Sequence, residues 1–208
     1  MKRRFLFFSV GLFILTMGVA LIIKAGLGAS AWDALAVGES NMFNITVGTA
    51  VIINGIVLIA LNAIIMKKKP DVLAAATIFV IGFLIDFWLE IILSTFAPEA
   101  LVSQLIALAL GILTVGLGVA IYLQAKFPAS PMDTLMVAIH TRFGLNLRNS
   151  RLISEGFALS LAFLFQGDIG VGTILVTVLL GFVVQFFFPI FERLFEKESM
   201  GKAAVPAE

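Results

Sequence analysis

The feature that most constrains this chain is a series of six apolar stretches, each long enough to cross a lipid bilayer. A helix needs about 20 mostly apolar residues to cross a hydrocarbon core of about 30 Å. The stretches cover residues 5–25, 47–66, 72–93, 101–123, 147–165 and 171–191. Backbone polar groups in lipid must be bonded internally, and the alternating pattern of barrel strands is absent from the sequence. The expected fold class is therefore an all-α polytopic membrane protein with six transmembrane helices.

The composition agrees with this class and excludes several functions. Hydrophobic residues make up 61% of the 208 residues and charged residues 13%, whereas a soluble domain carries about a quarter charged residues. The chain has no cysteine and one histidine, His140, which disfavours a metal centre or a thiolate nucleophile. It has no P-loop, no His-Glu-x-x-His and no Gly-x-Ser-x-Gly pattern. We therefore expect neither an enzyme nor an ATPase, and no cofactor, metal or nucleic-acid partner.

The basic residues predict the orientation. If six spans alternate, thirteen of the fourteen lysines and arginines fall on one side of the membrane, and Lys24 falls alone on the other. The thirteen are Lys2, Arg3, Arg4, Lys67, Lys68, Lys69, Lys126, Arg142, Arg148, Arg151, Arg193, Lys197 and Lys202. Because cytoplasmic segments are enriched in Lys and Arg, both termini are predicted to be cytoplasmic. An alternative for the N-terminus is a signal peptide cleaved near Ala29-Ser30-Ala31, but a similar sequence recurs near residue 130.

That recurrence is part of an internal repeat. Eleven of 37 positions are identical between residues 11–47 and 111–147, and residues 82–88 resemble 181–187. We divide the single membrane domain, 1–208, into repeat 1 at about 5–96, repeat 2 at about 100–193 and a cytoplasmic tail at about 194–208. Each repeat holds three spans, an odd number, so the second must enter the bilayer from the opposite side. The prediction is a 3+3 inverted repeat, a plan common among secondary transporters.

The most informative repeated motif is a serine followed three residues later by an aspartate. It occurs as Ser30 with Asp33 and as Ser130 with Asp133, and it predicts a helix start because the serine can cap the aspartate's amide. Both aspartates also suit the positive end of a helix dipole. Each motif therefore begins a short helix after the first span of its repeat.

The two short helices are predicted at 31–43 and 131–143. Thirteen residues at about 1.5 Å each give about 20 Å, too short to cross the core. Such a helix is either an amphipathic connector in the interface or a re-entrant element whose tip enters a cavity. Bends at Ala25–Gly28 and 127–129 would favour re-entry. A free helix start could hold an anion, although the capping aspartates would compete with it.

Polar residues at membrane depth are the main functional candidates, because an ionisable group there costs at least about 2.5 kcal/mol. Glu155 pairs with Asn54 across the repeat, and Asp86 pairs with Gln185. Glu90 lies one turn beyond Asp86. The functional hypothesis is that Glu155 and Asp86 carry coupling protons while Asn54 and Gln185 orient the substrate. The alternative is that all these groups bond to one another as interhelical glue, contributing roughly 0.6–2 kcal/mol each.

Small and aromatic residues receive structural interpretations. Gly11 and Gly18, like Gly111 and Gly118, lie seven residues apart on one helical face, where they would let helix backbones approach closely. The aromatic residues near span ends are predicted to be anchors at the membrane interface. They are Trp32, Trp88 and Tyr122.

The Gly-Leu-Gly-Ala-Ser-Ala-Trp-Asp block at 26–33 and its Pro-Ala-Ser-Pro-Met-Asp echo at 128–133 resemble the YczE/YitT-like bacterial membrane proteins, and the chain is more similar to the YczE branch. The first motif departs from the second at Ala31, where proline would be expected. The resemblance implies a bacterial inner-membrane protein of six spans and supplies no catalytic residues.

Two functions remain open at this stage. The first is a secondary transporter of a small polar solute that works by alternating access between the two repeats, with proton coupling as part of the hypothesis. The second is a non-transporting accessory or regulatory protein that binds a partner or a lipid. The lipid bilayer and a small-molecule solute are the expected partners, and the oligomeric state is left open.

Overall fold

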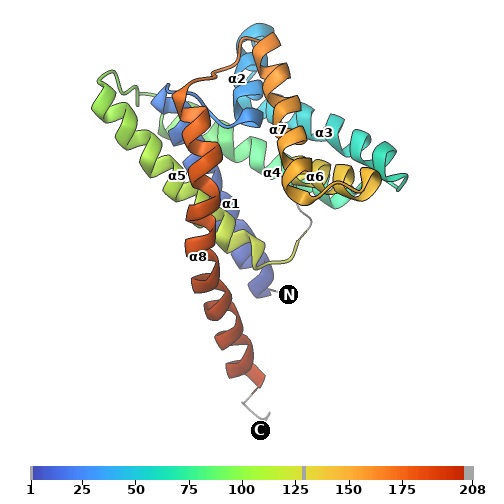
Figure 1. Cartoon of the computed structure of the whole chain (residues 1–208). Helices are drawn as coiled ribbons and strands as arrows, with labels where there is room; N and C mark the ends of the chain where they lie inside the picture. Colours follow the sequence, from blue (N-terminus) through green and yellow to red (C-terminus); the bar gives the residue numbers. More distant parts are fainter. Residues whose placement is uncertain (1, 128–129, 204–208) are drawn as a thin grey trace.

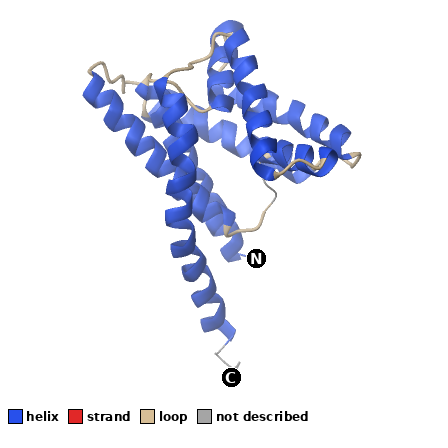
Figure 2. Cartoon of the chain, in the orientation of Figure 1, coloured by secondary structure: helices blue, strands red, loops and turns tan. Residues whose placement is uncertain are grey.

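The computed structural model describes residues 2–127 and 130–203, and this part of the chain is helical and free of strands (Figures 1 and 2). The elements are α1 (Lys2–Ala25), α2 (Ala31–Phe43), α3 (Val47–Met66), α4 (Val72–Asp86), η1 (Phe87–Ile92), α5 (Leu101–Leu123), α6 (Pro131–Phe143), α7 (Leu147–Leu164) and α8 (Val171–Ala203). The element η1 is a π-helical continuation of α4. The all-α fold class is confirmed.

Five helices are long and apolar enough to cross a membrane: α1, α3, α4 with η1, α5 and α8. The sequence predicts six, and α7 is the one that falls short. Its 18 residues carry the charged Arg148, Arg151 and Glu155 in the first half. These charges leave α7 less apolar than the other five helices. The structure supports a polytopic membrane protein without establishing the sixth crossing.

Helices α2 and α6 occupy the predicted 31–43 and 131–143 because their ends are capped as the sequence indicates. The C-caps Asn44 and Gly144 adopt left-handed φ angles of 55° and 69°, a conformation that asparagine and glycine tolerate well. The next helices start at Thr46 and Asn146, whose side chains accept the amide three residues on. The chain therefore turns sharply after each short helix.

Helices α1 and α5, the first spans of the two repeats, cross at close range. A Cβ added at Gly11 would lie 2.5 Å from the Tyr122 amide nitrogen, and one at Gly111 would lie 2.6 Å from Ile22 Cγ1. The start of α1 thus meets the end of α5, so the two helices run antiparallel. Added Cβ atoms at Gly18 and Gly118 would also meet the other helix. The prediction that these four glycines serve close packing is confirmed.

The remaining helices pack across the two repeats. Helix α2 packs on α7 and α6 packs on α3, a reciprocal arrangement of one element from each repeat. Helix α3 packs along α4, but α7 does not pack along α8 to a comparable extent; α8 packs along α5 instead. In Figure 1, α1, α5 and α8 lie together on one side, and α2, α3, α6 and α7 on the other. The packing of α8 on α5 has its counterpart in that of α4 and η1 on α1, so among the described helices only the weak α7–α8 contact departs from the repeat.

The loops at the ends of α1 and α7 are joined by backbone hydrogen bonds. The Ala29 amide donates to the Asp168 carbonyl at 3.0 Å, and the Gly172 amide donates to the Leu27 carbonyl at 2.7 Å. These bonds return the chain from the end of α1 to the start of α2, so that Ser30 reaches the interior. The bend predicted at 127–129 falls partly on residues 128–129, which lie outside the described residues.

One sequence interpretation, that of the aromatic residues near span ends, needs correction. The predicted interface anchors Trp88 and Tyr122 are each only 8% exposed. Both side chains therefore belong to the interior, and Trp88 donates its indole N–H to the Phe13 carbonyl at 3.3 Å. The predicted tail at 194–208 begins as a continuation of α8, which extends to Ala203; residues 204–208 lie outside the described residues.

Candidate functional site

A cavity of about 460 Å³ lies in the middle of the fold, and every helix from α1 to α8 contributes to its wall. This volume is within the range of about 300–1,000 Å³ that is typical of small-molecule sites. Most of the wall is apolar. The charged and polar side chains along it are Ser30, Trp32, Asp33, Asn54, Thr77, Tyr122, Ser130, Asp133, Arg151, Glu155 and Gln185.

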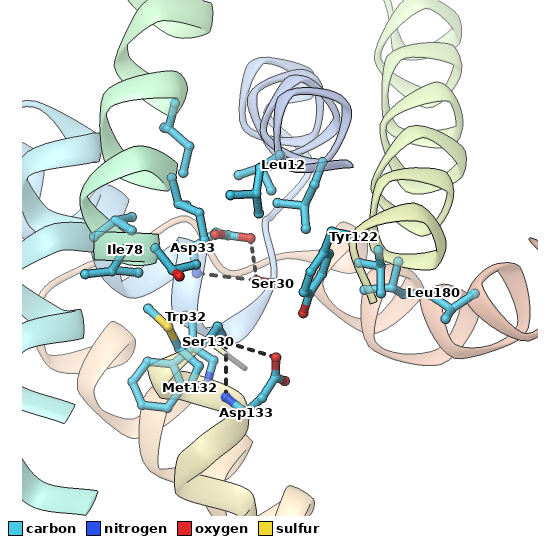
Figure 3. A pocket seen from close by; sticks show the side chains of 18 of the residues that line it. Leu12, Ser30, Trp32, Asp33, Ile78, Tyr122, Ser130, Met132, Asp133 and Leu180 are labelled. Atoms are coloured by element: carbon cyan, nitrogen blue, oxygen red, sulfur yellow. Dashed lines mark hydrogen bonds between the residues drawn. The ribbon is translucent and has the colours of Figure 1, made fainter. Parts of the chain in front are cut away.

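The two repeated Ser–Asp motifs meet at this cavity. The Ser30 hydroxyl donates to the Asp33 carboxylate at 2.5 Å and accepts the Asp33 amide at 3.4 Å. The Ser130 hydroxyl donates to the Asp133 carboxylate at 2.9 Å and accepts the Asp133 amide at 3.2 Å. Figure 3 shows both pairs facing the same space. The starts of α2 and α6 therefore carry their own carboxylates into the cavity wall.

Asp33 lies in the more enclosed of the two motifs. Burial raises the pKa of the Asp33 carboxyl to about 6; the Ser30 hydrogen bond lowers it, and the nearby Glu155 carboxylate raises it. Desolvation has this sign because it penalises the charged form of an acid. Asp33 therefore changes its charge at near-neutral pH, where an ordinary aspartate stays ionised.

Asp133 faces the cavity from the opposite repeat. Burial raises the pKa of its carboxyl, while the Ser130 hydrogen bond and the Arg151 guanidinium lower it. Arg151 also donates to Glu155 at 3.3 Å, one turn further along α7. Helix α7 thus presents a positive charge close to Asp133 and a negative charge close to Asp33.

Two aromatic side chains complete this part of the wall. Tyr122 is 8% exposed, and within the described chain its hydroxyl has no hydrogen-bond partner. Figure 3 shows this hydroxyl pointing into the space beside the two Ser–Asp pairs. Trp32 is partly buried and lies next to Asp33 in α2. The Tyr122 hydroxyl is therefore available to hydrogen-bond a ligand or water in the cavity.

The structure brings most of the sequence candidates together. Glu155, Asn54 and Gln185 all line the cavity with the four motif residues. Asn54 donates its side-chain amide to Glu39 of α2 at 2.6 Å, so it links α3 to α2 at the cavity edge. Asn54 and Glu155, which the sequence pairs across the repeat, therefore line the same cavity.

Asp86 and Glu90 are placed elsewhere. Asp86 accepts the Thr46 hydroxyl and the Gly48 amide, both at 2.6 Å, and so ties the start of α3 to the end of α4. Glu90 is exposed on η1, and neither residue is part of the cavity wall. This arrangement matches the interhelical-glue alternative for Asp86. A membrane-depth position does not tell which way a helix faces, so the sequence could not separate Asp86 from Glu155.

Four polar residues of the cavity wall were absent from the sequence candidates, and one of them is the uncharged Thr77 of α4. Arg151 was counted as a cytoplasmic charge, and Trp32 and Tyr122 as interface anchors. The spacing of Arg151 and Glu155 by four residues was a usable signal, because such a pair shares one helical face. Among the described residues, no group of three or more His, Asp or Glu side chains could hold a metal ion.

Comparisons with other proteins agree with the membrane assignment. Residues 2–189 match a family described as a family of unknown function, DUF6198. The uncharacterized protein YyaS of Bacillus subtilis (strain 168) is 38% identical over 192 residues, covering 92% of this chain and 96% of that protein. The uncharacterized membrane protein YczE of the same organism is 34% identical over 189 residues, covering 89% and 86%. No solved structure is significantly similar.

Proposed function

The chain belongs to DUF6198, a family of unknown function, and is similar to the membrane protein YczE, and from its central cavity we propose that it is a secondary transporter of a small polar solute. The observation that carries this proposal is a chamber in which charged side chains of both repeats face each other inside an apolar, membrane-embedded chain. Charged side chains that line a cavity at membrane depth generally mark a pathway for substrate or ions.

The proposed mechanism is alternating access between two inverted repeats, with α7 as the sixth crossing. Two features support it. The first spans of the repeats, α1 and α5, run antiparallel, and the reciprocal packing of α2 on α7 and of α6 on α3 joins the repeats around the cavity. Transporters with inverted repeats bind their substrate at such an interface, often at the starts of discontinuous helices. In this arrangement α2 and α6 are re-entrant, because both start at the cavity.

We place both termini on the cytoplasmic side of the inner membrane. The basic residues favour this orientation, and the two ends of the membrane domain meet in space. Arg3 donates to the Leu194 carbonyl at 3.0 Å, and the rings of Phe7 and Phe195 are 5.2 Å apart. The beginning of α1 and the end of the apolar part of α8 therefore lie on the same side.

Proton coupling is assigned to the carboxylates of the cavity, with Glu155 as the residue to test first. Glu155 lies beside Arg151 and influences Asp33, so a change in its protonation alters the charge seen by a solute in the chamber. Asp86 is less suited to this role, because its carboxylate is held by Thr46 and Gly48.

The alternative function is a non-transporting accessory or regulatory protein. Helix α8 favours it, because α8 packs mainly on α5 and leaves Ile174, Val178, Phe182 and Phe186 exposed. In a membrane such a face contacts either lipid or another protein. An accessory protein would use this face and would leave the cavity unoccupied by any transported solute.

Uptake into proteoliposomes separates the two functions. Purified protein is reconstituted, and the uptake of candidate solutes is measured with and without a pH gradient. We expect uptake to be saturable, to respond to the gradient and to be lost in Glu155→Gln. Glu90→Gln, an exposed carboxylate outside the cavity, is the matched control and should transport normally. If Glu155→Gln transports with unchanged pH dependence, the coupling assignment is wrong; if no solute is taken up under any gradient, the accessory function is favoured.

A further inference from the structure

The charge balance of the cavity indicates what kind of solute it takes. Its described wall contains three carboxylates, those of Asp33, Asp133 and Glu155, and one guanidinium, that of Arg151. Arg151 is engaged by Glu155 at 3.3 Å and also faces Asp133. When all four groups are ionised, two negative charges are left without a matching positive charge. In a chamber surrounded by apolar helices such an excess is unfavourable, unless protons or a bound cation offset it.

The starts of α2 and α6 do not offer an anion site. A helix start binds anions through its free amides and the positive end of its dipole. Here the first-turn carboxylates Asp33 and Asp133 already occupy that position, and the serine hydroxyls take up the amides of these aspartates. An anionic solute would therefore meet two fixed negative charges. The hydrogen bonds that confirm the predicted Ser–Asp caps therefore disfavour the anion site that the sequence suggested at these helix starts.

An independent observation at this place points to a ligand. The Tyr122 side chain is more than nine-tenths buried, and its hydroxyl, which has no partner in the described chain, is aimed into the cavity beside the Ser–Asp pairs. A phenol oxygen accepts a hydrogen bond from an ammonium N–H. Tyr122 and Trp32 both line the cavity, and aromatic rings attract a cation most strongly where water is excluded.

We propose that the cavity binds a small organic cation, with its ammonium group held by Asp33 and Asp133 and contacted by Tyr122 and Trp32. Two carboxylates contributed by opposite repeats suit a diamine as well as a monoamine. This inference deepens the transport proposal by naming its substrate class, and it concerns binding, so it can be tested whether or not transport occurs.

Protonation at Asp33 would then compete with the cation. The charged and titratable groups that share the cavity with Asp33 are Glu155 and Arg151 of α7, Asp133 of α6 and Tyr122 of α5. Helices α1, α3, α4 and α8 add only apolar or uncharged side chains to this wall. Because the pKa of Asp33 is raised to about 6, cation affinity should increase as the pH rises from 5 to 7. This is the behaviour that exchange of a proton for a cation requires.

The test is equilibrium binding to the purified full-length protein in an uncharged detergent, by calorimetry at pH 7.5. The probes are the diamine putrescine, tetramethylammonium, zwitterionic glycine and the dianion succinate. We expect both cations to bind and succinate not to bind. Asp33→Asn and Asp133→Asn should each weaken cation binding about tenfold or more, a loss of about 1.4 kcal/mol. Glu99→Gln, which alters an exposed carboxylate outside the cavity wall, is the control and should bind like the unaltered protein.

Two further measurements do not depend on the folding of the Asn variants. Tyr122→Phe keeps the ring and removes the hydroxyl, so the affinity for putrescine, whose ammonium groups have N–H donors, should fall by about threefold to tenfold while the melting temperature is unchanged. Tetramethylammonium has no N–H, so its affinity should change less. In Trp88→Phe, Trp32 is the only tryptophan, and its emission should shift on cation binding. The cation proposal is overturned if succinate or glycine binds and the cations do not, or if no probe binds. It is also overturned if the affinity for putrescine changes neither with pH nor in Tyr122→Phe.

The results also separate this inference from the proposed function. Cation binding that depends on Asp33 and Asp133, without uptake in proteoliposomes, would support the site and reject transport. Uptake of an anionic or neutral solute that depends on Glu155 would support transport and reject the cation class.

Discussion

The close crossing of α1 and α5 provides a quantitative test of the fold. In Gly18→Ala, the added Cβ of α1 would lie 2.5 Å from the amide nitrogen of Val115 and 2.8 Å from the Gly111 carbonyl oxygen on α5. Ordinary contacts of a carbon atom are about 3.5–4.0 Å, so the two backbones must separate by about 1 Å. A backbone cannot rotate away as a side chain can, and overpacking of this kind costs about 1–3 kcal/mol.

Gly156→Ala is the matched control, because a Cβ at Gly156, also inside a helix, meets nothing within 4 Å. This variant gains only the helix propensity of alanine, about 0.5–1 kcal/mol. In a chain of this length 1 kcal/mol shifts the melting temperature by about 2–4 °C. Gly18→Ala should therefore melt about 2–12 °C below the unaltered protein once the propensity gain seen in Gly156→Ala is subtracted.

The assay is thermal unfolding of the purified variants in one detergent, followed by circular dichroism or by loss of the monodisperse peak. Gly118→Ala, at the repeat-equivalent position, should show a loss of the same sign, because its Cβ would meet Leu15 of α1. If Gly18→Ala melts at or above the temperature of Gly156→Ala, the close antiparallel contact of α1 and α5 is wrong.

Three other perturbations have defined outcomes. Because the chain has no native cysteine, a single cysteine at Asn41 should react with an impermeant thiol reagent from outside intact cells, and one at Asn146 should not; the reverse pattern rejects the orientation. The pKa of Asp33 is raised from an ordinary 3.8 to about 6, so the folded state binds the carboxyl proton more tightly than the unfolded state does. The stabilisation from this bound proton is complete below pH 4 and is lost as the pH rises through 6. As the pH is raised from 4 to 7, Asp33→Asn should therefore gain up to about 3 kcal/mol of stability relative to the unaltered protein. If the melting temperatures of the two proteins differ by the same amount at pH 4 and at pH 7, this prediction is wrong. Asp86→Ala should lower the free energy of unfolding by about 1–2 kcal/mol, because the cap on α3 is lost, without changing cation affinity. A loss of cation binding in a stably folded Asp86→Ala would instead place this carboxylate in the solute pathway. The control Glu90→Gln should change neither the free energy of unfolding nor the cation affinity.

Local structure was predictable from the sequence because its signals are local. The Ser30 and Ser130 motifs, the left-handed Asn44 and the capping Asn146 each act within a few residues, and the structure has the short helices at the predicted residues. Glycine spacing alone indicated that α1 and α5 each pack closely on another helix, but not that they pack on each other. The apolar length of a segment also identified five of the six predicted spans.

The site was only partly predictable, because membrane depth and helix face are separate properties. Glu155 and Asp86 both lie at depth, yet one faces the cavity and the other caps a neighbouring helix. Tyr122 looked like an interface anchor, since its position near the end of a span does not show that the chain beyond α5 folds back over it. The packing of α8 on α5 depends on contacts between distant segments that no local pattern encodes.

The most direct test of a solute pathway through the cavity is the accessibility of one position in its wall from each side of the membrane. Met132 lines the cavity next to Asp133, and Met132→Cys would be the only cysteine in the chain. Alternating access predicts that this cysteine reacts with an impermeant thiol reagent added to either side of oriented vesicles, and that a bound solute slows both reactions. A cysteine that reacts from one side only, whether solute is present or absent, would show that the cavity is not a pathway across the membrane.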